Sequence, residues 1–326
     1  MSKAIRIHEH GGPDVLRYED VAVGAPGPGE IRVRHTAVGL NFIDVYHRAG
    51  LYPLALPATL GMEAAGVVEA VGGDVTDVKE GDRVAYATQP LGAYSEMRLM
   101  PAGRVVKLPD GIDDRTAAAM MLQGMTAEYL IRRTYKVTAG EPVLFHAAAG
   151  GVGLIACQWL KHLGATVIGT VGSAEKAKLA KEHGCDHVIN YREESFTQRV
   201  KEITGGDGVP VVYDSVGKDT WDGSLDCLRP FGLMVSYGNS SGAVPPVNLG
   251  ILGAKGSLYV TRPTIMTYTA KREDLTASAQ ALFEVVLSGA VKVAINQTYP
   301  LAEAAQAHRD LEARKTTGST ILLPSV

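Results

Sequence analysis

Apolar and polar positions alternate along the chain in two different ways, and the change falls near residue 125. Before it, short β-type runs such as Ile31–Arg34 and Ala64–Val71 are separated by turns rich in glycine and proline. Many short strands with frequent turns predict a compact β-rich unit. After it, apolar runs alternate with amphipathic stretches, which is typical of strands and helices that follow one another in turn.

The second part begins with a predicted strand over Val143–His146 and a helix over Val152–Leu163. The strand Thr166–Val171 follows, and then a helix with Ser173 as its N-cap that ends at Gly184. Four further strands are predicted, over His187–Asn190, Val209–Asp214, Leu233–Tyr237 and Leu258–Thr261. Six strands with helices between them predict an α/β fold with a doubly wound parallel sheet of the Rossmann type.

The C-terminal part predicts two amphipathic helices, over Leu275–Leu287 and Leu301–Ala313, and a last strand over Ser319–Leu323. Since that strand is too short to stand alone, we expect it to return to the N-terminal β-rich unit.

Composition narrows the class of protein. The chain has 326 residues, of which 46% are hydrophobic and 21% charged, as in folded globular proteins. A net charge of −3 provides no long-range attraction for nucleic acid or an anionic membrane. We find no N-terminal signal sequence and no apolar run of roughly 18 residues, and the three cysteines are an odd number spread along the sequence. We therefore expect a cytoplasmic protein with reduced cysteines.

The strongest local motif is VLFHAAAGGVG at residues 143–153, between a predicted strand and a predicted helix. Compared with G-x-G-x-x-G, Ala148 takes the first glycine place, and Gly150 and Gly153 take the other two. Small residues let the backbone turn sharply and bring its N–H groups, with the positive end of the helix, against a pyrophosphate. The motif in this context predicts dinucleotide binding.

The end of the next strand indicates which dinucleotide is bound. NAD-specific sites place an acid there, roughly 20 residues past the loop, to hold the ribose 2′-OH. This chain has Gly172 and Ser173 instead, with Lys176 close behind, which leave room for a 2′-phosphate and can donate to it. The alternative is that Ser173 is only an N-cap and Lys176 only a solvated helix residue, and Glu175 is an awkward neighbour. The pattern favours NADPH.

In several sequence segments the chain resembles a known family, the NADPH:quinone oxidoreductases, which are relatives of zeta-crystallin within the medium-chain dehydrogenase/reductase superfamily. The segments that carry the resemblance cover essentially the whole chain. They are HGGPDVL (10–16), GLNFIDVYHRAGLYP (39–53), GMEAAGVV (61–68), GDRVAY (81–86), HAAAGGVGLIACQ (146–158), VYDSVG (212–217), YGNSSG (237–242) and YVTRP (259–263).

The resemblance implies a GroES-like catalytic domain made from residues 1–124 and 266–326, with a Rossmann NADPH-binding domain, residues 125–265, inserted into it. It also implies an active site in the cleft between the domains and a homodimer, for which the Leu258–Thr261 strand is a plausible pairing edge. The family's cofactor contacts fall on Asn41, Tyr46, Gly151, Val152, Gly172, Ser173, Lys176, Tyr191, Ser215, Tyr237, Gly238, Asn239, Ser240, Arg262, Pro263 and Thr264. The glycine motif adds Gly150 and Gly153 to this set.

The same resemblance implies that no metal is bound. Zinc alcohol dehydrogenases of the superfamily carry a cysteine where this chain has Asn41, and a histidine beside a glutamate where it has Met62 and Glu63. Zinc binds the replacing groups poorly. The four-cysteine cluster of their structural zinc has no counterpart, since no cysteine lies between Arg83 and Gln123.

Quinone reduction fits a site without zinc, because the quinone carbonyls are already electrophilic and need only positioning and hydrogen-bond donors. The candidate donors are Asn41, Tyr46 and Tyr52, with Thr126 as a weaker one. Each also has a purely structural interpretation. Two alternatives stay open, namely an NADPH-dependent 2-alkenal or enoyl reductase, and a crystallin-like NADPH-binding structural or RNA-binding protein.

Overall fold

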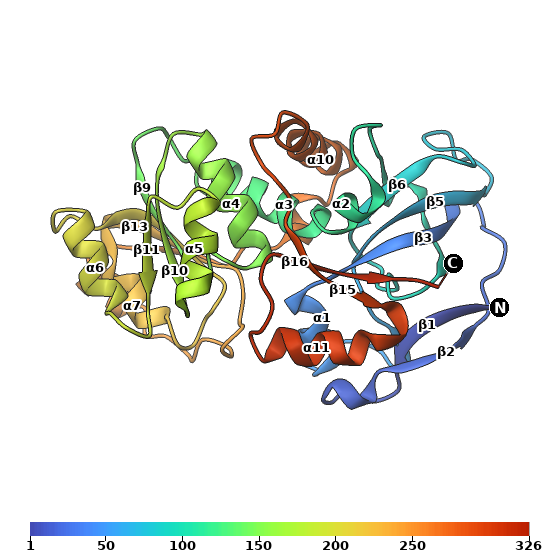
Figure 1. Ribbon diagram of the computed structural model, residues 1–326, viewed down its shortest axis with the longest axis horizontal. Helices are drawn as coiled ribbons and strands as arrows, with labels where there is room; N and C mark the ends of the chain where they lie inside the picture. The colour runs from blue at the N-terminus through green and yellow to red at the C-terminus, as the bar shows by residue number, and fades with distance from the viewer. Residues whose placement is uncertain (326) are drawn as a thin grey trace. The chain divides into compact units, whose positions relative to one another are not determined.

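The computed structural model describes residues 1–325, which divide into two compact units. Unit 1 contains Met1–Met125, Thr269–Leu287 and the described residues from Val293 onward. Unit 2 contains Thr126–Tyr268 and Ser288–Lys292. The predicted fold class is confirmed: one unit is built on a six-stranded parallel sheet, and the other is a β-rich unit made from both ends of the chain (Figure 1).

The sheet of unit 2 has the strand order β11-β10-β9-β12-β13-β14, and every neighbouring pair is parallel. The strands are β9 (Pro142–Phe145), β10 (Thr166–Val171), β11 (His187–Asn190), β12 (Val209–Asp214), β13 (Leu228–Ser236) and β14 (Tyr259–Thr261). The chain starts in the middle of the sheet, builds outward on one side and then crosses back to the other, so the order of strands reverses between β9 and β12. Such a reversal leaves a crevice at the carboxyl ends of the strands.

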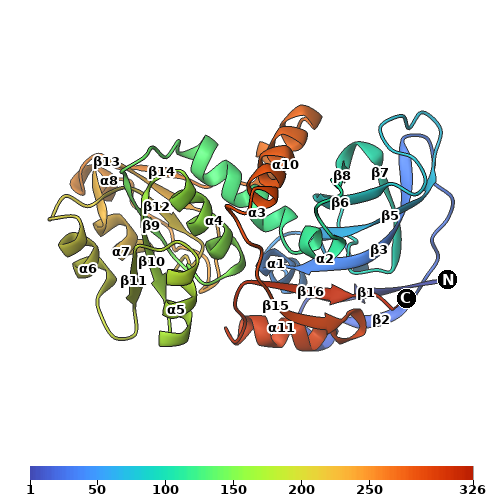
Figure 2. The ribbon, with the colours of Figure 1, turned by 45° about the horizontal axis from the view of Figure 1, so that its top comes forward.

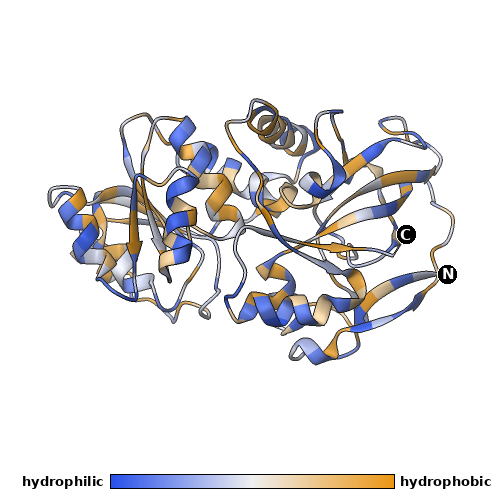
Figure 3. Ribbon diagram, in the orientation of Figure 1, coloured by the Kyte–Doolittle hydropathy of each residue, from blue (hydrophilic) through white to orange (hydrophobic). Residues whose placement is uncertain are grey.

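Helices connect these strands and cover the sheet. They are α4 (Gly151–His162), α5 (Ala174–Glu182), α6 (Phe196–Ile203), α7 (Trp221–Asp226), α8 (Gly250–Ala254) and α9 (Ile265–Tyr268). Helix α4 packs beside α5, and α6 packs beside α7. Because crossovers are right-handed, the reversal of strand order places the two pairs on opposite faces (Figure 2). The strands are largely apolar and α5 and α6 carry hydrophilic residues (Figure 3), as expected of a sheet buried on both faces.

Unit 1 contains a sheet with the path β15-β16-β3-β5-β6-β8, in which β7 also pairs with β3, and a smaller sheet ordered β2-β1-β4. Its strands are β1 (Ser2–Ile7), β2 (Arg17–Val21), β3 (Glu30–Leu40), β4 (Ala58–Thr59), β5 (Glu63–Val71), β6 (Arg83–Ala87), β7 (Met97–Pro101), β8 (Val106–Lys107), β15 (Ile295–Pro300) and β16 (Ser319–Leu323). Its helices are α1 (Phe42–Arg48), α2 (Asp114–Ala118), α10 (Arg272–Leu287) and α11 (Ala304–Glu312), and α3 (Met121–Tyr129) runs across the unit boundary.

The expected return of the last strand to the N-terminal β-rich unit is confirmed. Strand β16 pairs antiparallel with β3, with Thr320 opposite Leu40, and parallel with β15. Strand β15 was not predicted, because its residues are alternately half-buried and exposed and include the polar Asn296 and Gln297. Strand β13 also begins at Leu228, five residues earlier than predicted, because Pro230 and the left-handed Phe231 (φ 62°) interrupt its apolar pattern without ending it.

Candidate functional site

In unit 2, the residues predicted to contact the cofactor lie at one edge of the sheet. The loop 146–150 follows β9, Gly172 and Ser173 follow β10, and Tyr191 follows β11. Ser215 follows β12, the run Tyr237–Ser240 follows β13, and Arg262 follows β14. Because the strands are parallel, all these positions come together at the carboxyl edge, where doubly wound sheets bind their ligands.

The predicted phosphate loop leads into α4 at the point where the strand order reverses. Gly150 is the N-cap, in an extended conformation (φ −80°, ψ 175°), and α4 continues for twelve residues from Gly151. The first amides of such a helix have no partner within it and can donate to an anion. A Cβ atom on Gly153 would lie 2.4 Å from the Ala147 carbonyl oxygen, so glycine is required there. A Cβ on Gly150 would lie 3.2 Å from the same oxygen, which is tight but open to adjustment.

The structure confirms Ser173 as the N-cap of α5, since its Oγ accepts the backbone N–H of Lys176 at 3.3 Å. The hydroxyl proton of Ser173 is not used in that bond and stays available to donate, so the capping role and the phosphate-binding role are compatible. Tyr191 is 41% exposed, and its ring leans over Gly172, where a Cβ atom would lie 2.4 Å from the phenolic oxygen. This edge of the sheet thus combines glycine, a free hydroxyl proton and an aromatic face.

The loops that follow β12 and β13 pack directly against each other. A Cβ atom on Gly238 would lie 2.5 Å from the carbonyl oxygen of Ser215, and Ser240 donates its backbone N–H to the same oxygen at 3.1 Å. Arg262 fixes this pair of loops from β14, donating to the Gly238 carbonyl at 3.0 Å and to Ser236 Oγ at 3.2 Å. Tyr237 packs on Phe145 with ring centroids 6.1 Å apart, while Pro263 is buried and Thr264 exposed.

These features fit a dinucleotide. A pyrophosphate requires a helix N-terminus and glycines where a Cβ atom would clash, and both are present here. A 2′-phosphate requires that no acid stands at the end of β10, and none does.

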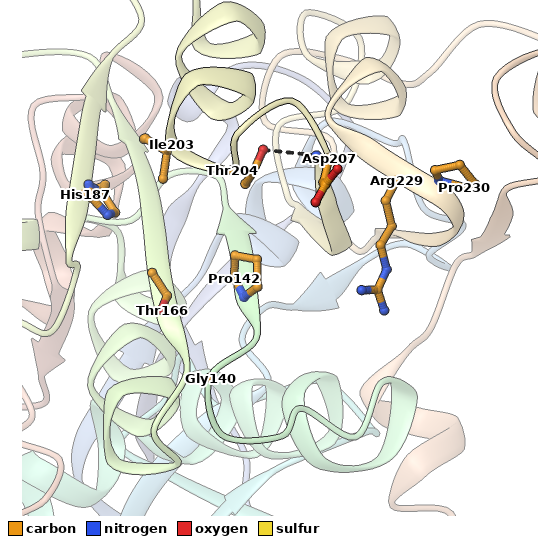
Figure 4. Close-up of a pocket in the computed structure, with 10 residues that line it drawn as sticks. Gly140, Pro142, Thr166, His187, Ile203, Thr204, Asp207, Arg229 and Pro230 are labelled. Carbon is orange, nitrogen blue, oxygen red and sulfur yellow. Dashed lines mark hydrogen bonds between the residues drawn. The ribbon is translucent and has the colours of Figure 1, made fainter.

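A cavity of about 520 Å³ lies at the other edge of the same sheet, among residues that begin the strands (Figure 4). It includes Pro142, Thr166, His187 and Arg229. Its position at the amino ends separates it from the candidate site.

In unit 1, Asn41 lies at the centre of a buried hydrogen-bond network. Its side-chain N–H donates to Glu63 Oε2 at 2.7 Å, and its Oδ1 accepts from Gln123 Nε2 at 3.2 Å. Glu63 Oε1 accepts the backbone N–H of Leu122 at 2.7 Å. Glycine is required at position 39, where a Cβ atom would lie 2.2 Å from Glu63 Oε2. The amide of Asn41 is therefore fixed in orientation, with one N–H not used in these bonds.

Asn41 is also the N-cap of α1, which contains Tyr46. Its backbone N–H donates to Asp44 Oδ2 at 2.9 Å, closing a capping box. Tyr46 is 8% exposed and packs edge-on against Tyr52, with ring centroids 5.4 Å apart. Thr126 lies on α3 and is buried. The structure thus brings Asn41, Tyr46 and Tyr52 together around α1.

A second buried chain of hydrogen bonds anchors α1. Tyr94 donates its hydroxyl to Asp44 Oδ2 at 3.1 Å and contacts His308 Nε2 at 3.0 Å. Arg48 donates to His308 Nδ1 at 2.9 Å and forms a bidentate pair with Glu312 at 2.8 and 2.9 Å. Burial lowers the pKa of His308 to about 3, so its ring is neutral, with the proton on Nε2 facing Tyr94. These hydrogen bonds therefore hold α1 against α11.

The carboxyls in this network have raised pKa values. Burial raises the pKa of Glu63 to about 8, against the opposing effect of the hydrogen bonds from Asn41 and Leu122. Burial likewise raises the pKa of Asp44 to about 7, against the bonds from Asn41 and Tyr94. Perturbed carboxyls of this kind cluster at functional sites.

Asn41 thus hydrogen-bonds both Glu63 and Gln123 within unit 1. Among residues 1–325, no group of three or more His, Cys, Asp or Glu side chains could hold a metal ion. No helix in that part of the chain is long and apolar enough to cross a membrane. The three cysteines are buried and unpaired.

Sequence reasoning missed several residues of the two sites. In unit 1 these are Asp44, Gln123, Tyr94 and His308. In unit 2 they are His146, Thr170, Asp214 and Ser224, which form a buried chain beneath the predicted cofactor loops. The available signal was weak: His146 and Asp214 each stand at the polar end of an apolar strand, but nothing in the sequence pairs them.

Comparison with known proteins identifies relatives over the whole length of the chain. The family model of the alcohol dehydrogenase GroES-like domain matches residues 27–110, and that of the zinc-binding dehydrogenase matches residues 151–284. The chain is 58% identical to a quinone oxidoreductase of Pseudomonas aeruginosa, over 99% of this chain and 100% of the relative. It is 50% identical to a 2-haloacrylate reductase of a Burkholderia species, over 99% of both chains.

Among solved structures, the Escherichia coli quinone oxidoreductase complexed with NADPH superimposes with a TM-score of 0.97. It is 54% identical, and the match covers 99% of this chain and 100% of that one. A mycobacterial protein complexed with NADPH gives a TM-score of 0.96 at 48% identity, again over 99% and 100% of the two chains.

Proposed function

Because the chain belongs to the quinone oxidoreductase family, we propose that it reduces quinones with NADPH by a reaction that does not depend on zinc. The observation that carries this proposal is the carboxyl edge of the parallel sheet in unit 2. There the N-terminus of α4 and the glycines of the neighbouring loops form a dinucleotide cradle. Gly172 and Ser173 stand where an NAD-specific enzyme has an acid, and Lys176 follows in α5.

In this proposal the amides at Gly151, Val152 and Gly153 face the pyrophosphate, while Ser173 and Lys176 hold the 2′-phosphate. Tyr191 stacks on the adenine. The loop residues from the other strands, with Asn41 and Tyr46 of unit 1, complete the binding set: Gly150, Gly172, Ser215, Tyr237, Gly238, Asn239, Ser240, Arg262, Pro263 and Thr264.

Bound NADPH supplies a hydride, which with one proton converts a quinone to its hydroquinone. The part of this chain is to orient the substrate and stabilise the charge that develops on its oxygen. We assign the first role to Asn41, whose unused N–H donates to a quinone carbonyl while Glu63 and Gln123 hold its amide in place. Tyr46 and Tyr52 form an aromatic wall with two phenolic donors, and Thr126 is a further candidate donor.

A panel assay tests the proposal. NADPH oxidation is measured with 1,4-benzoquinone, a medium-chain 2-alkenal and 2-haloacrylate, and again with NADH in place of NADPH. We expect the quinone and NADPH to give the highest kcat/KM. The similarity to a 2-haloacrylate reductase supports a second candidate, reduction of a carbon–carbon double bond conjugated to a carbonyl or carboxylate. Faster turnover of the alkenal or haloacrylate would establish that candidate in place of quinone reduction.

We further propose that the chain forms a homodimer in the cytoplasm. Strand β14 is the edge of the six-stranded sheet and has no partner on its outer side among the described residues. Its Tyr259 and Val260 are 62% and 40% exposed, and an exposed apolar edge strand is a template for pairing. Pairing two copies through β14 would join their sheets about a twofold axis.

The three unpaired cysteines support the proposed location in the cytoplasm, because cysteines stay reduced in a reducing compartment.

A further inference from the structure

A chain of four buried polar side chains lies beneath the predicted cofactor loops of unit 2. Thr170 is on β10, His146 follows β9, Ser224 is on α7 and Asp214 ends β12. All four are at most 1% exposed. Thr170 Oγ1 lies 2.8 Å from His146 Nδ1, and His146 Nε2 lies 3.0 Å from Ser224 Oγ. Ser224 Oγ lies 2.7 Å from Asp214 Oδ2.

The donors and acceptors in this chain can be assigned. Ser224 has one hydroxyl proton, which it donates to the Asp214 carboxylate, so it must accept from His146. His146 then has its proton on Nε2, and its bare Nδ1 accepts from the Thr170 hydroxyl. Burial lowers the pKa of His146, against the opposing effect of Asp214, which fits a neutral ring with a single N–H. All three bonds therefore point toward one carboxylate.

The carboxylate end of the chain shapes a predicted cofactor loop. Asp214 Oδ1 accepts the backbone N–H groups of Val216 and Gly217, at 2.8 and 3.0 Å, and so fixes the turn that contains Ser215. Gly217 has a φ of +92°, and a Cβ atom there would lie 2.6 Å from the Gly242 carbonyl oxygen. The turn is thereby held against the loop after β13.

The imidazole end reaches the phosphate loop. His146 is the first residue of that loop, and its backbone N–H donates to the Tyr213 carbonyl at 3.0 Å. The Thr170 carbonyl accepts the backbone N–H of Ala148 at 3.1 Å. These hydrogen bonds thus link the loops after β9 and β12 through side chains that lie too deep to touch a ligand themselves. The turn at Ser215 in its turn packs against the loop after β13.

We propose that His146, Ser224 and Asp214 are positioning residues that hold these loops in the geometry required for NADPH, and that cofactor affinity depends on their unbroken chain of hydrogen bonds. The proposal rests on the function proposed above. Removal of Ser224 leaves one buried polar atom on each neighbour, His146 Nε2 and Asp214 Oδ2, without its partner. Such atoms relax by shifting the backbone that carries them. That backbone is, on one side, the phosphate loop and, on the other, the turn at Ser215.

The first test is Ser224→Ala. We expect the Kd and KM for NADPH to rise about tenfold, while kcat at saturating NADPH and the KM for the quinone stay within threefold of wild type. The matched control is Ser95→Ala in unit 1, which also removes a buried serine hydrogen bond (2.8 Å to the Gly92 carbonyl) and should leave the Kd unchanged. An NADPH Kd within twofold of wild type in Ser224→Ala would overturn the proposal.

The second test needs no cofactor. The ¹⁵N resonances of the His146 ring, identified by their loss in His146→Gln, should show the proton on Nε2 in the wild type. In Asp214→Asn the new amide donates to Ser224, so each hydrogen bond from Ser224 to Thr170 reverses its direction. The ring proton of His146 should then move from Nε2 to Nδ1. A wild-type His146 proton on Nδ1, or an unchanged proton position in Asp214→Asn, would refute the proposed chain of hydrogen bonds. Absence of NADPH binding by the wild type in calorimetry would instead defeat the proposed function and leave this result standing.

Discussion

The side-chain amide of Asn41 donates to the buried carboxyl group of Glu63 over 2.7 Å. Within this pair Glu63 orients Asn41. Glu63 can do so because both its oxygens accept N–H donors, from Asn41 on one side and from Leu122 on the other. The orientation of the candidate substrate donor thus depends on a residue that is itself fully buried.

Glu63→Gln tests this dependence. An amide has one acceptor oxygen, so either Asn41 or Leu122 faces an NH₂ group and the Asn41 amide turns or shifts. We expect kcat with 1,4-benzoquinone to fall ten- to a hundredfold, while the Kd for NADPH, measured by calorimetry, stays within threefold, because most of the cofactor's proposed contacts are in unit 2. Glu69→Gln on the same strand, at a half-exposed ion pair with Arg34, is the control. An unchanged kcat in Glu63→Gln would exclude a role for this pair.

The same carboxyl makes stability depend on pH. The pKa of Glu63 is about 8 in the folded chain, above the ordinary value of 4.5, so between these values the folded state binds more protons than the unfolded one. Its contribution is therefore complete below pH 4.5 and is lost as the pH rises through 8. We expect the free energy of unfolding of the wild type to fall from pH 5 to pH 8.5 by at least about 1 kcal/mol more than that of Glu63→Gln. Urea titrations at the two pH values measure the difference, and parallel curves would contradict it.

Lys176→Ala should discriminate between the two nicotinamide cofactors. Loss of a cation facing the 2′-phosphate should raise the KM for NADPH about tenfold or more, and that for NADH less than twofold. Lys178→Ala is the control, since Lys178 is on the same helix with its side chain 80% exposed. Steady-state kinetics with both cofactors provide the comparison. Equal effects on NADPH and NADH would place the 2′-phosphate elsewhere.

Local features of the site could be predicted from sequence, and long-range features could not. The phosphate loop is visible because its strand, its glycines and the start of its helix lie within eleven consecutive residues, 143–153. The contacts of Asn41 with Glu63 and Gln123 span 22 and 82 residues, and no periodicity in the chain encodes that pairing. The chain from His146 to Ser224 spans 78 residues for the same reason. The parallel sheet was predictable because its strands are buried on both faces, whereas β15 has polar residues among its apolar ones.

Two glycines of the phosphate loop should respond differently to substitution. A Cβ atom on Gly150 meets only the Ala147 carbonyl oxygen, at 3.2 Å, so Gly150→Val should fold but place its methyl groups where the pyrophosphate approaches. A Cβ atom on Gly153 would lie 2.4 Å from that oxygen and 2.7 Å from Ala148, so Gly153→Ala should lower the melting temperature. Thermal unfolding and NADPH calorimetry separate the effects. Binding of NADPH by Gly150→Val would contradict the assigned position of the pyrophosphate.

The edge strand β14 provides the test of assembly. Replacing both Tyr259 and Val260 with lysine puts two charges on the outermost strand of the sheet, where a second copy would pair. We expect sedimentation to show a dimer for the wild type and a monomer for the double variant, with NADPH affinity within threefold of wild type, because the proposed cofactor loops lie at the carboxyl edge and not along the outer side of β14. Leu287→Lys, at a site 51% exposed in unit 1, is the control and should remain a dimer. A wild-type monomer, or a double variant that still forms a dimer, would show that β14 is not the pairing edge, and the exposed Tyr259 and Val260 would then need another explanation.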